Sequence, residues 1–388
     1  MEPKIRLNGF SGEWSTRSLK EKEFTILAGG DIDRSLIKEK GKYPVVANAL
    51  SNEGIVGYYD RYYRVKAPAV SVTGRGEIGH AQARKVSFTP VVRLLSIVSN
   101  HDVDFLANAI NCHKVVQEST GVPQLTTEKL SQYIIAFPND VEEEKAIGNY
   151  IVSVDSIILS TTKKIDTLKQ IKTASLQSMF PQEGESVPKV RFKGFEGEWK
   201  KVRLGDITKG FMYGINAAAV PYDGSNKYLR ITDIDDSTHI FLQDSLTTPG
   251  TNLSYCDEYI MQEGDIVVAR TGASVGKSYI YHESDGKVYF AGFLIRIRLE
   301  DIVNHDFVFQ NTLSYQYSKY IKLVSMRSGQ PGVNVDELKS YKLCIPSFEE
   351  QQKIADYFTN LDKQISLQSQ RLEKLKQIKA ACLDMMFV

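Results

Sequence analysis

The chain contains two long helical patterns that are near copies of each other, and this repeat constrains the fold more than any other feature. The pentapeptide LKQIK occurs at residues 168–172 and again, 207 residues later, at 375–379. Apolar residues upstream of each copy recur every three or four positions, the spacing of one stripe along a helix. The stripes consist of Ile147, Ile151, Val154, Ile158, Ile165 and Leu168, and of Ile354, Phe358, Leu361, Ile365, Leu372 and Leu375.

Neither helix is expected to be stable alone in water, so each stripe needs a partner. The first helical run, residues 142–180, would extend about 58 Å at 1.5 Å per residue. The region 184–346 joins the end of the first helix to the start of the second, so paired helices must run antiparallel. The region 1–138 would then lie at the opposite end. Polar residues interrupt both stripes at equivalent positions, Lys172 and Lys379, and are predicted to fix the register.

Further apolar residues lie beside the stripes. Tyr150 and Tyr357 occupy equivalent flanking positions, and Ile171 and Ile378 do the same further along. A two-helix seam buries only a narrow stripe, so we expect these side chains to contact the globular regions or another protein. The alternative is two unrelated amphipathic helices, each packed on its own domain, and the repeat argues against it.

A second repeated element precedes each globular region. PKIRLNGFSGEW at residues 3–14 recurs as PKVRFKGFEGEW at 188–199, and residues 119–138 recur loosely at 327–346. Short strand-like runs separated by Gly, Asn and Asp fill the rest. We therefore predict a mixed α/β (α+β) fold in which an antiparallel coiled coil separates two globular regions, with a pseudo-twofold internal repeat. The predicted segments are a globular region at 1–138, a long helix at 139–183, a globular region at 184–346 and a long helix at 347–388.

Composition narrows the class of protein. Forty-eight basic and 47 acidic side chains give a net charge of +1, so a nucleic-acid partner would have to meet local basic groups or be held with help from other subunits. The four cysteines are scattered without a CxxC pair, which predicts reduced intracellular thiols rather than a zinc site. With no long apolar run, we expect a cytoplasmic protein without membrane contact.

Two glycine-rich loops resemble nucleotide-binding motifs. GASVGKS at 272–278 is one residue shorter than a P-loop, and GRGEIG at 74–79 matches the dinucleotide fingerprint without a long helical stripe after it. Neither motif occurs in both copies, so no cofactor is predicted, although a nucleotide-binding enzyme that uses the GASVGKS loop stays an alternative. The copies share a looser pattern, in which Thr73, Gly74, Ile78, Gly79 and His80 match Thr271, Gly272, Val275, Gly276 and Lys277.

These loops, and the stretch before each long helix, are candidates for contact with DNA. Backbone N–H groups and lysines can position phosphates, whereas arginines can bind guanine edges. The alternative is a glycine turn with solvated charges. The candidates are Thr73, Arg75, His80, Arg84, Lys85 and Gln124 in the first region, and Tyr213, Asn216, Arg270, Thr271, Ser274, Lys277, Ser278, Arg327, Ser328 and Gln330 in the second. No catalytic or metal-binding set occurs in both copies, so we predict no enzyme activity.

The combination of these features resembles the specificity (S) subunit of type I restriction-modification systems over nearly the whole chain. The resemblance comes from the order of two differing globules and two alike helices, and from four motifs: PSFEEQQKIADYF at 346–358, LEKLKQIK at 372–379, GFxGEW at both repeat starts and RTGxxxGK at 270–277. The first copy departs from the pattern at 118–130 and 140–150.

The resemblance implies a function and partners. Each globule would be a target recognition domain that reads one half of an asymmetric bipartite site in double-stranded DNA. The helices would set the spacing and dock two methyltransferase (M) subunits, through which motor/nuclease (R) subunits join. The subunit itself would be non-catalytic. A structural adaptor that does not read DNA is the remaining alternative.

Overall fold

The computed structural model describes residues 2–113, 124–326 and 330–387. The chain divides into two compact units. Unit 1 comprises Met1–Thr162 and Gln370–Val388, and unit 2 comprises Lys163–Ser369. Each unit therefore contains one globular region and a segment of both long helices.

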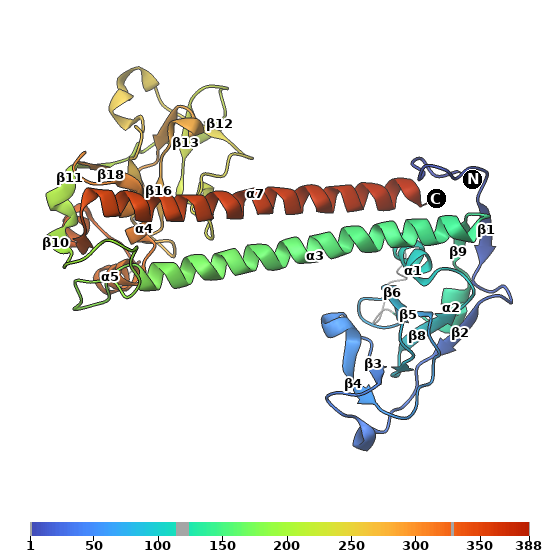
Figure 1. Cartoon of the computed structure of the whole chain (residues 1–388). Coiled ribbons are helices and arrows are strands. Elements are labelled where there is room, and N and C mark those ends of the chain that lie inside the picture. Colours follow the sequence, from blue (N-terminus) through green and yellow to red (C-terminus); the bar gives the residue numbers. More distant parts are fainter. Residues whose placement is uncertain (1, 114–123, 327–329, 388) are drawn as a thin grey trace. The chain divides into compact units, whose positions relative to one another are not determined.

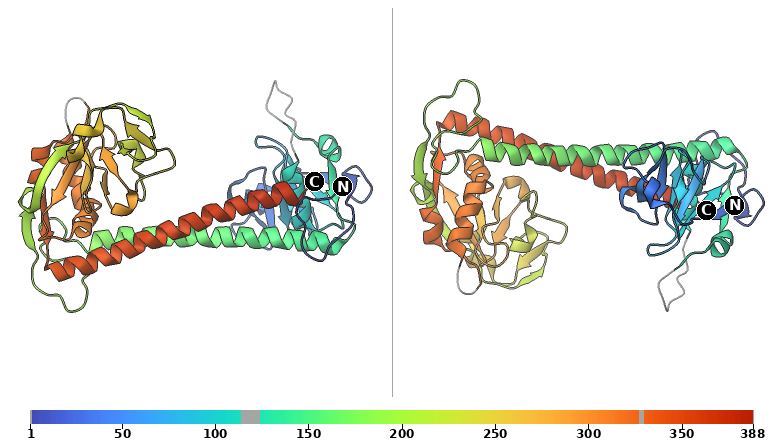
Figure 2. Two further views of the ribbon diagram at one scale, coloured as in Figure 1. Left: turned by 90° about the horizontal axis from the view of Figure 1, so that it is seen from above. Right: turned by 90° about the horizontal axis from the view of Figure 1, so that it is seen from below.

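The two predicted long helices are confirmed as α3, Val141–Ser178, and α7, Phe348–Met386 (Figure 1). In each unit their segments lie side by side and run in opposite directions (Figure 2). Asp140 caps the start of α3, because its carboxylate accepts a hydrogen bond from the Glu142 N–H at 2.9 Å. Ser347 caps α7 in a similar way, since its hydroxyl accepts a hydrogen bond from the Glu350 N–H at 3.4 Å.

Most of the predicted stripe residues are buried where the helices meet each other and the globular regions. Three of them, Ile158, Leu372 and Leu375, are only partly buried, and they lie near the middle of α3 and toward the end of α7. The flanking Tyr150 is 37% exposed. The fully buried stripe residues are Ile147, Ile151, Val154, Ile165, Leu168, Ile354, Phe358, Leu361 and Ile365.

Both polar stripe residues form ion pairs across the seam. In unit 2, Lys172 Nζ lies 2.7 Å from Asp362 Oδ1, and in unit 1, Lys379 Nζ lies 2.6 Å from Asp155 Oδ1. The two pairs are related by the repeat, because each lysine and each aspartate has its counterpart 207 residues away. The helices thus pair antiparallel in the same register in both units.

The described residues of unit 1 form three small sheets and two short helices besides the long helical segments. A four-stranded antiparallel sheet of order β2-β8-β5-β6 forms its centre, and all five residues of β5 are buried. The elements are β1 (Ser15–Ser18), β2 (Thr25–Ala28), β3 (Tyr43–Val46), β4 (Ile55–Tyr59), β5 (Ala69–Thr73), β6 (Ala81–Arg84), β7 (Thr89–Pro90), β8 (Leu94–Val98), β9 (Ile134–Phe137), α1 (Val103–Cys112) and α2 (Thr127–Ser131), with 3-10 turns at Arg34–Leu36 and Ser51–Gly54. Besides the central sheet, β1 pairs with β9, and β3 lies between β4 and β7.

Unit 2 contains an equivalent four-stranded antiparallel sheet of order β11-β18-β15-β16. The pair β10-β19 corresponds to β1-β9, and the parallel pair β13-β17 corresponds to β3-β7. The elements are β10 (Lys200–Arg203), β11 (Thr208–Tyr213), β12 (Ala219–Pro221), β13 (Lys227–Leu229), β14 (Thr247–Pro249), β15 (Ile266–Ala269), β16 (Ser278–Ile280), β17 (Val288–Phe290), β18 (Leu294–Leu299), β19 (Lys342–Ile345), α4 (His305–Thr312), α5 (Tyr315–Ser325) and α6 (Val335–Ser340), with 3-10 turns at Leu204–Ile207, Ile231–Asp233, Leu253–Tyr255, Asp257–Tyr259 and Glu283–Asp285.

The mixed α/β fold is therefore as predicted, and the repeat extends further than the sequence indicated. The two globular regions share the order and direction of their central strands although their sequences differ. Unit 2 also contains the helix α5 and the pair β12-β14, and this pair has no counterpart among the described strands of unit 1.

Candidate nucleic-acid interface

Both glycine loops connect neighbouring antiparallel strands. Residues 74–80 join β5 to β6, and residues 270–277 join β15 to β16. A P-loop or a dinucleotide fingerprint requires a helix directly after the loop, so that the helix N-terminus faces the phosphate. Neither loop is followed by a helix, so the geometry gives no support to a nucleotide site at GASVGKS.

Strand register corrects the sequence match between the loops. The Gly79 N–H donates to the Thr73 carbonyl at 2.8 Å, and the Gly276 N–H donates to the Ala269 carbonyl at the same distance. Thr73 therefore corresponds to Ala269, whereas the sequence comparison had matched it with Thr271. The match of the two Thr-Gly pairs was wrong by two residues, because they lie at different points of the two loops, whereas the match of Gly79 with Gly276 is confirmed.

The corrected register explains which glycines the loops need. Gly76 and Gly272 become equivalent, with φ angles of 76° and 78°, and Gly79 and Gly276 have φ angles of 81° and 86°. Residues with a side chain rarely adopt this left-handed backbone. The loops are thus the same two-glycine turn, with one more residue in unit 2.

Each glycine loop lies against the stretch that precedes a long helix. In unit 1, Arg75 forms a β-bridge with Gln124, and the Leu125 N–H donates to the Gly74 carbonyl at 2.9 Å. In unit 2, Thr271 bridges to Gly332, and the Val333 N–H donates to the Arg270 carbonyl at 2.8 Å. The two groups of candidate residues, which are far apart in sequence, therefore form one surface in each unit.

In unit 1 the candidates divide into exposed and buried side chains. Arg75, His80, Lys85 and Gln124 are exposed. Lys85 Nζ lies 2.8 Å from Asp104 Oδ2, and the Lys85 side chain is 61% exposed. The Thr73 hydroxyl is buried and accepts a hydrogen bond from the His80 N–H at 2.9 Å, so it shapes the loop from inside.

Arg84 is held inside unit 1 rather than at its surface. It is 8% exposed and donates to the Ser71 hydroxyl and the Glu53 carbonyl, both at 2.8 Å. Burial lowers the pKa of its guanidinium, and the Glu53 carboxylate opposes this shift. We therefore leave Arg84 out of the surface. Sequence reasoning also missed Asn48, whose side-chain oxygen accepts from the Gly74 N–H at 2.6 Å and holds the loop.

In unit 2, Arg270 has an exposed aromatic partner. Its guanidinium carbon lies 4.8 Å from the centre of the Tyr213 ring, and Tyr213 is 40% exposed. Among the described residues, no acceptor forms a hydrogen bond with this guanidinium, so stacking orients it while its N–H groups stay available. Asn216 and Gln330 are exposed, and Thr271 and Ser274 are partly exposed. Arg327 and Ser328 lie outside the described residues.

Lys277 and Ser278 are held by contacts within unit 2. Lys277 Nζ donates to the Ile234 carbonyl at 2.8 Å and lies 2.7 Å from Asp236 Oδ1, with its side chain 11% exposed. The Ser278 hydroxyl is buried and lies 2.7 Å from the Thr312 hydroxyl. The lysine that makes GASVGKS look like a P-loop therefore fastens the loop to residues 234–236.

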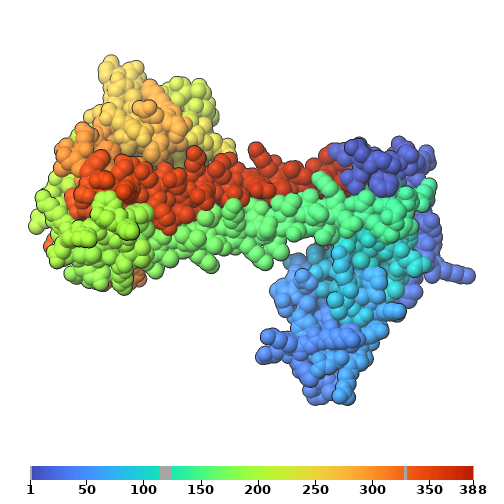
Figure 3. Space-filling view, in the orientation of Figure 1, coloured from blue at the N-terminus to red at the C-terminus, as the bar shows by residue number. Residues whose placement is uncertain are grey.

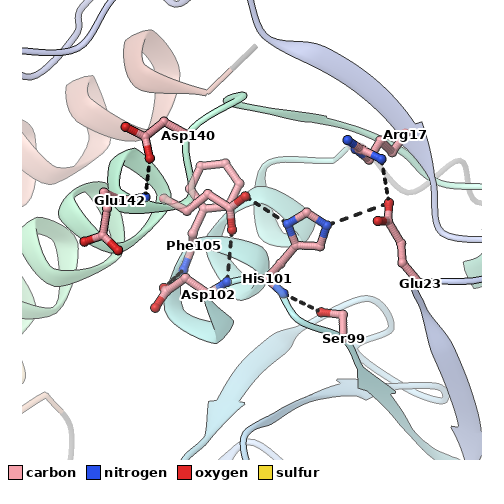
Figure 4. A network of polar contacts seen from close by, with 9 residues as sticks. Arg17, Glu23, Ser99, His101, Asp102, Phe105, Asp140 and Glu142 are labelled. Carbon is pink, nitrogen blue, oxygen red and sulfur yellow. Dashed lines mark hydrogen bonds and ion pairs between the residues drawn. The ribbon is translucent and has the colours of Figure 1, made fainter.

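The acidic start of α3 is also held by internal contacts, and Figure 4 shows His101 and Asp102 beside it. Glu144, 1% exposed, accepts from the Asp102 N–H at 3.0 Å and lies 2.8 Å from His101 Nδ1. The other ring nitrogen of His101 lies 3.8 Å from Glu23. In unit 2, Gln351 takes the equivalent place and accepts from the Asn304 N–H at 2.9 Å. The acidic run thus anchors the helix to its globular region.

Two further observations concern metal binding and membrane spans. In the part of the chain that the structure describes, no three His, Cys, Asp or Glu side chains gather closely enough to hold a metal ion. Within the same described residues, every helix is too short or too polar to cross a membrane.

The fold is similar to that of a solved protein. A crystal structure of the S subunit of a type I restriction-modification system from M. genitalium superposes with a TM-score of 0.70 at 17% identity, covering 100% of this chain and 99% of that one. At this identity the likeness concerns the fold.

Sequence comparison defines the family. The model of the type I restriction modification DNA specificity domain matches residues 12–170 and 196–377, once for each copy of the repeat. The chain therefore belongs to the family of type I restriction-modification specificity subunits.

Individual relatives are distant. The type I restriction enzyme MjaVIII specificity subunit of Methanocaldococcus jannaschii is 22% identical over 279 residues, 69% of this chain and 64% of the relative. The HindI specificity subunit of Haemophilus influenzae is 27% identical over 196 residues, 49% of this chain and 41% of the relative. A putative type I specificity subunit of Mycoplasma pneumoniae, S.MpnORF507P, is 28% identical over 132 residues, 33% of this chain and 36% of the relative. The chain thus spans about a third to two thirds of the length of these relatives.

Proposed function

We propose that this chain selects the DNA sequence for a type I restriction-modification complex. Each globular region, residues 1–138 and 184–346, reads one half of an asymmetric bipartite site. The helical segments, 139–183 and 347–388, set the distance between the halves and dock two methyltransferase subunits, to which motor/nuclease subunits attach. The chain itself is non-catalytic.

The observation that carries this proposal is the contrast between a shared framework and differing surfaces. The two central sheets have the same strand order, and their glycine loops have the same hydrogen-bond register. At equivalent loop positions, however, Gly74 and Arg75 of unit 1 are replaced by Arg270 and Thr271 of unit 2. Two surfaces built on the same framework with different side chains suit two different half-sites.

In the proposed interface, the exposed groups divide between positioning and reading. Backbone N–H groups of the glycine turns and Lys85 suit phosphate oxygens. Arg75 and Gln124 in unit 1, and Arg270 on Tyr213 with Gln330 in unit 2, suit base edges or phosphates, because guanidinium and amide groups can form paired hydrogen bonds.

Partner docking is proposed for exposed apolar side chains on the helices. Ile171 and Ile378, equivalent in the repeat, are 42% and 45% exposed, and Leu159 and Leu367 are more than half exposed. Apolar side chains on long solvated helices favour burial against another protein. The near-neutral net charge fits a subunit that binds DNA tightly only when its partners contribute positive charge.

A domain exchange tests the proposal. Residues 15–137, which begin with β1 and end with its partner β9, are replaced by the corresponding region of another specificity subunit, and modified adenines are mapped genome-wide. One half of the modified sequence should change while the other half and the spacer stay the same. As a matched control, exchange of residues 200–345 should change only the other half. If either exchange alters both halves, or neither, the assignment of one half-site to each region is wrong.

A further inference from the structure

The repeated segments 3–14 and 188–199 have no role in the proposed reading of DNA. Neither forms a helix or a strand, yet they are the most similar part of the two globular regions. Their contacts show what they do within each unit.

In unit 1 the segment touches both long helices. Arg6 donates from Nε and Nη2 to the two carboxylate oxygens of Glu143 near the start of α3, both at 2.7 Å. One residue earlier, the Ile5 N–H donates to the carbonyl of Met385 at the end of α7, at 3.0 Å. Figure 3 shows this N-terminal segment, in dark blue, packed against the red end of α7. Adjacent residues therefore hold the beginning of one helix and the end of the other.

In unit 2 the same contacts recur at equivalent positions. Arg191 donates from Nε and Nη2 to Glu350 near the start of α7, at 2.7 and 2.8 Å. The Val190 N–H donates to the carbonyl of Ser178, the last residue of α3, at 2.9 Å. The roles of α3 and α7 are exchanged, as the pseudo-twofold repeat requires.

The remaining identical residues of the motif support this arrangement. Arg6 Nη1 also donates to the Gly12 carbonyl, and Arg191 Nη1 to the Gly197 carbonyl, each at 2.6 Å. Gly12 and Gly197 have φ angles of 94° and 79°, so the turn that offers this carbonyl needs glycine. The closing tryptophans, Trp14 and Trp199, are both 3% exposed and anchor the segment in the core of each unit.

We propose that each repeated segment is a clasp that fastens the start of one long helix to the end of the other. Arg6 and Arg191 are its positioning residues. Glu143 and Glu350 are each 1% exposed, and a buried carboxylate without its cation is strongly unfavourable. Loss of the arginine therefore releases the glutamate toward water and, through Ile5 or Val190, the end of the opposite helix. The next step rests on the proposed function. By fixing the orientation of each reading region on the helices, the clasps would also keep the spacer length constant.

Hydrogen exchange tests the clasp without reference to DNA. In Arg6→Met, the amides of Ile5 and of residues 383–386 should exchange at least tenfold faster than in the wild type, together with those of 144–148. Arg6→Lys should give a smaller increase, because a lysine cannot bridge both carboxylate oxygens and the glycine carbonyl. Lys4→Met, which removes an exposed charge from the same segment, should change nothing. If Arg6→Met opens only the start of α3 and leaves residues 383–386 unchanged, the segment is not a clasp.

Spacer fidelity tests the consequence. Wild-type complex and complex with Arg191→Met or Lys189→Met are compared on DNA whose spacer is native or one base pair longer or shorter. Arg191→Met should raise the ratio of altered-spacer to native-spacer modification at least fivefold without changing either half-site, and Lys189→Met should not. An unchanged ratio would overturn the positioning role. If instead the wild type modifies no bipartite site, the proposed function fails. The hydrogen-exchange experiment on Arg6→Met then still tests the clasp.

Discussion

Removal of Asp362 should destabilise the helix pair far more than removal of its counterpart Asp155. Both aspartates pair with a lysine of the opposite helix at nearly the same distance, 2.7 and 2.6 Å. The pairs differ in exposure. In unit 2 the Lys172 side chain is 11% exposed and that of Asp362 30%, whereas in unit 1 the values for Lys379 and Asp155 are 29% and 47%. The repeat thus supplies the same interaction in two environments.

The expected magnitudes follow from this difference. Asp362 also accepts a hydrogen bond from Gln310 Nε2 at 3.1 Å, so Asp362→Ala leaves a nearly buried ammonium and a buried amide without their acceptor. We expect a loss of about 2 kcal/mol in the local opening free energy, or roughly thirtyfold faster exchange. Asp155→Ala should cost about 0.5 kcal/mol or less, the usual value for an exposed pair. Adding Lys172→Met to Asp362→Ala should recover most of the loss, because no unpaired buried cation remains.

Native-state hydrogen exchange is the suitable assay, because a chain of two units does not unfold in one step. Amides of residues 165–175 and 358–366 report on unit 2, and those of 150–160 and 375–383 report on unit 1. Equal acceleration by the two single variants would refute the reasoning, since it would mean that burial does not control the strength of these pairs. Failure of Lys172→Met to restore slow exchange would refute the part assigned to the unpaired cation.

Two further predictions concern turns of the globular regions. Gly276→Ala should destabilise the β15–β16 turn by ~2–3 kcal/mol, whereas Gly76→Ala should destabilise the β5–β6 turn by only ~1 kcal/mol. Both glycines have a left-handed backbone, which a residue with a Cβ adopts at a cost. Only at Gly276 would the new Cβ also meet a neighbour, Ile321 Cγ2 at 2.6 Å. Exchange rates of the strand amides in each variant check this, and equal losses would contradict it. The pKa of Asp235 is lowered to about 2, because hydrogen bonds from Thr238 and Ser237 outweigh the burial that raises it. Its folded pKa lies below the usual value near ~3.9, so its stabilisation of the turn at 235–238 is present above pH ~4 and lost as the pH falls toward ~2. A carboxyl NMR titration with a midpoint at pH 4 or above would contradict this assignment.

The long helices were predictable because the information for them is local and present twice. A period of three and four residues defines a helix face without knowledge of the rest of the chain. The predicted run 142–180 differs from the observed α3, Val141–Ser178, only at its ends. The direction of pairing followed from connectivity alone, and the ion pairs of Lys172 and Lys379 show that it was right in both units.

The strand order of the globular regions was not predictable from the same sequence. Their strands are two to six residues long, and central pairs such as β2–β8 join segments about 70 residues apart. Short apolar runs do not specify their partners, which long-range packing decides. The likeness of the two sheets was hidden for this reason, because the two regions keep the same pairing with different side chains.

The candidate surface shows a similar limit. Sequence spacing drew attention to the glycine loops, but it could not separate exposed from internal cations. Arg84 donates hydrogen bonds to Ser71 and Glu53, and Lys277 contacts Ile234 and Asp236. These partners lie far away in the sequence, so spacing alone could not reveal them. Asn48, which holds the first loop, gave no signal in the sequence because a single asparagine after a strand is common.

The two copies of the repeat are most alike at positions where a substitution would lower the stability of the fold. Arg6 and Glu143 depend on each other, since replacing either leaves a buried charge or donor, and the glycines of the clasp cannot gain a side chain without backbone strain. Arg75 and Thr271, in contrast, occupy equivalent loop positions, exposed in unit 1 and partly exposed in unit 2, where the two side chains differ without a change of fold. Stability therefore keeps the clasps and helices alike while the loop surfaces differ. If each region reads one half-site, as we propose, such a chain could change the side chains of one reading surface while the clasp and helix contacts of that unit stay the same.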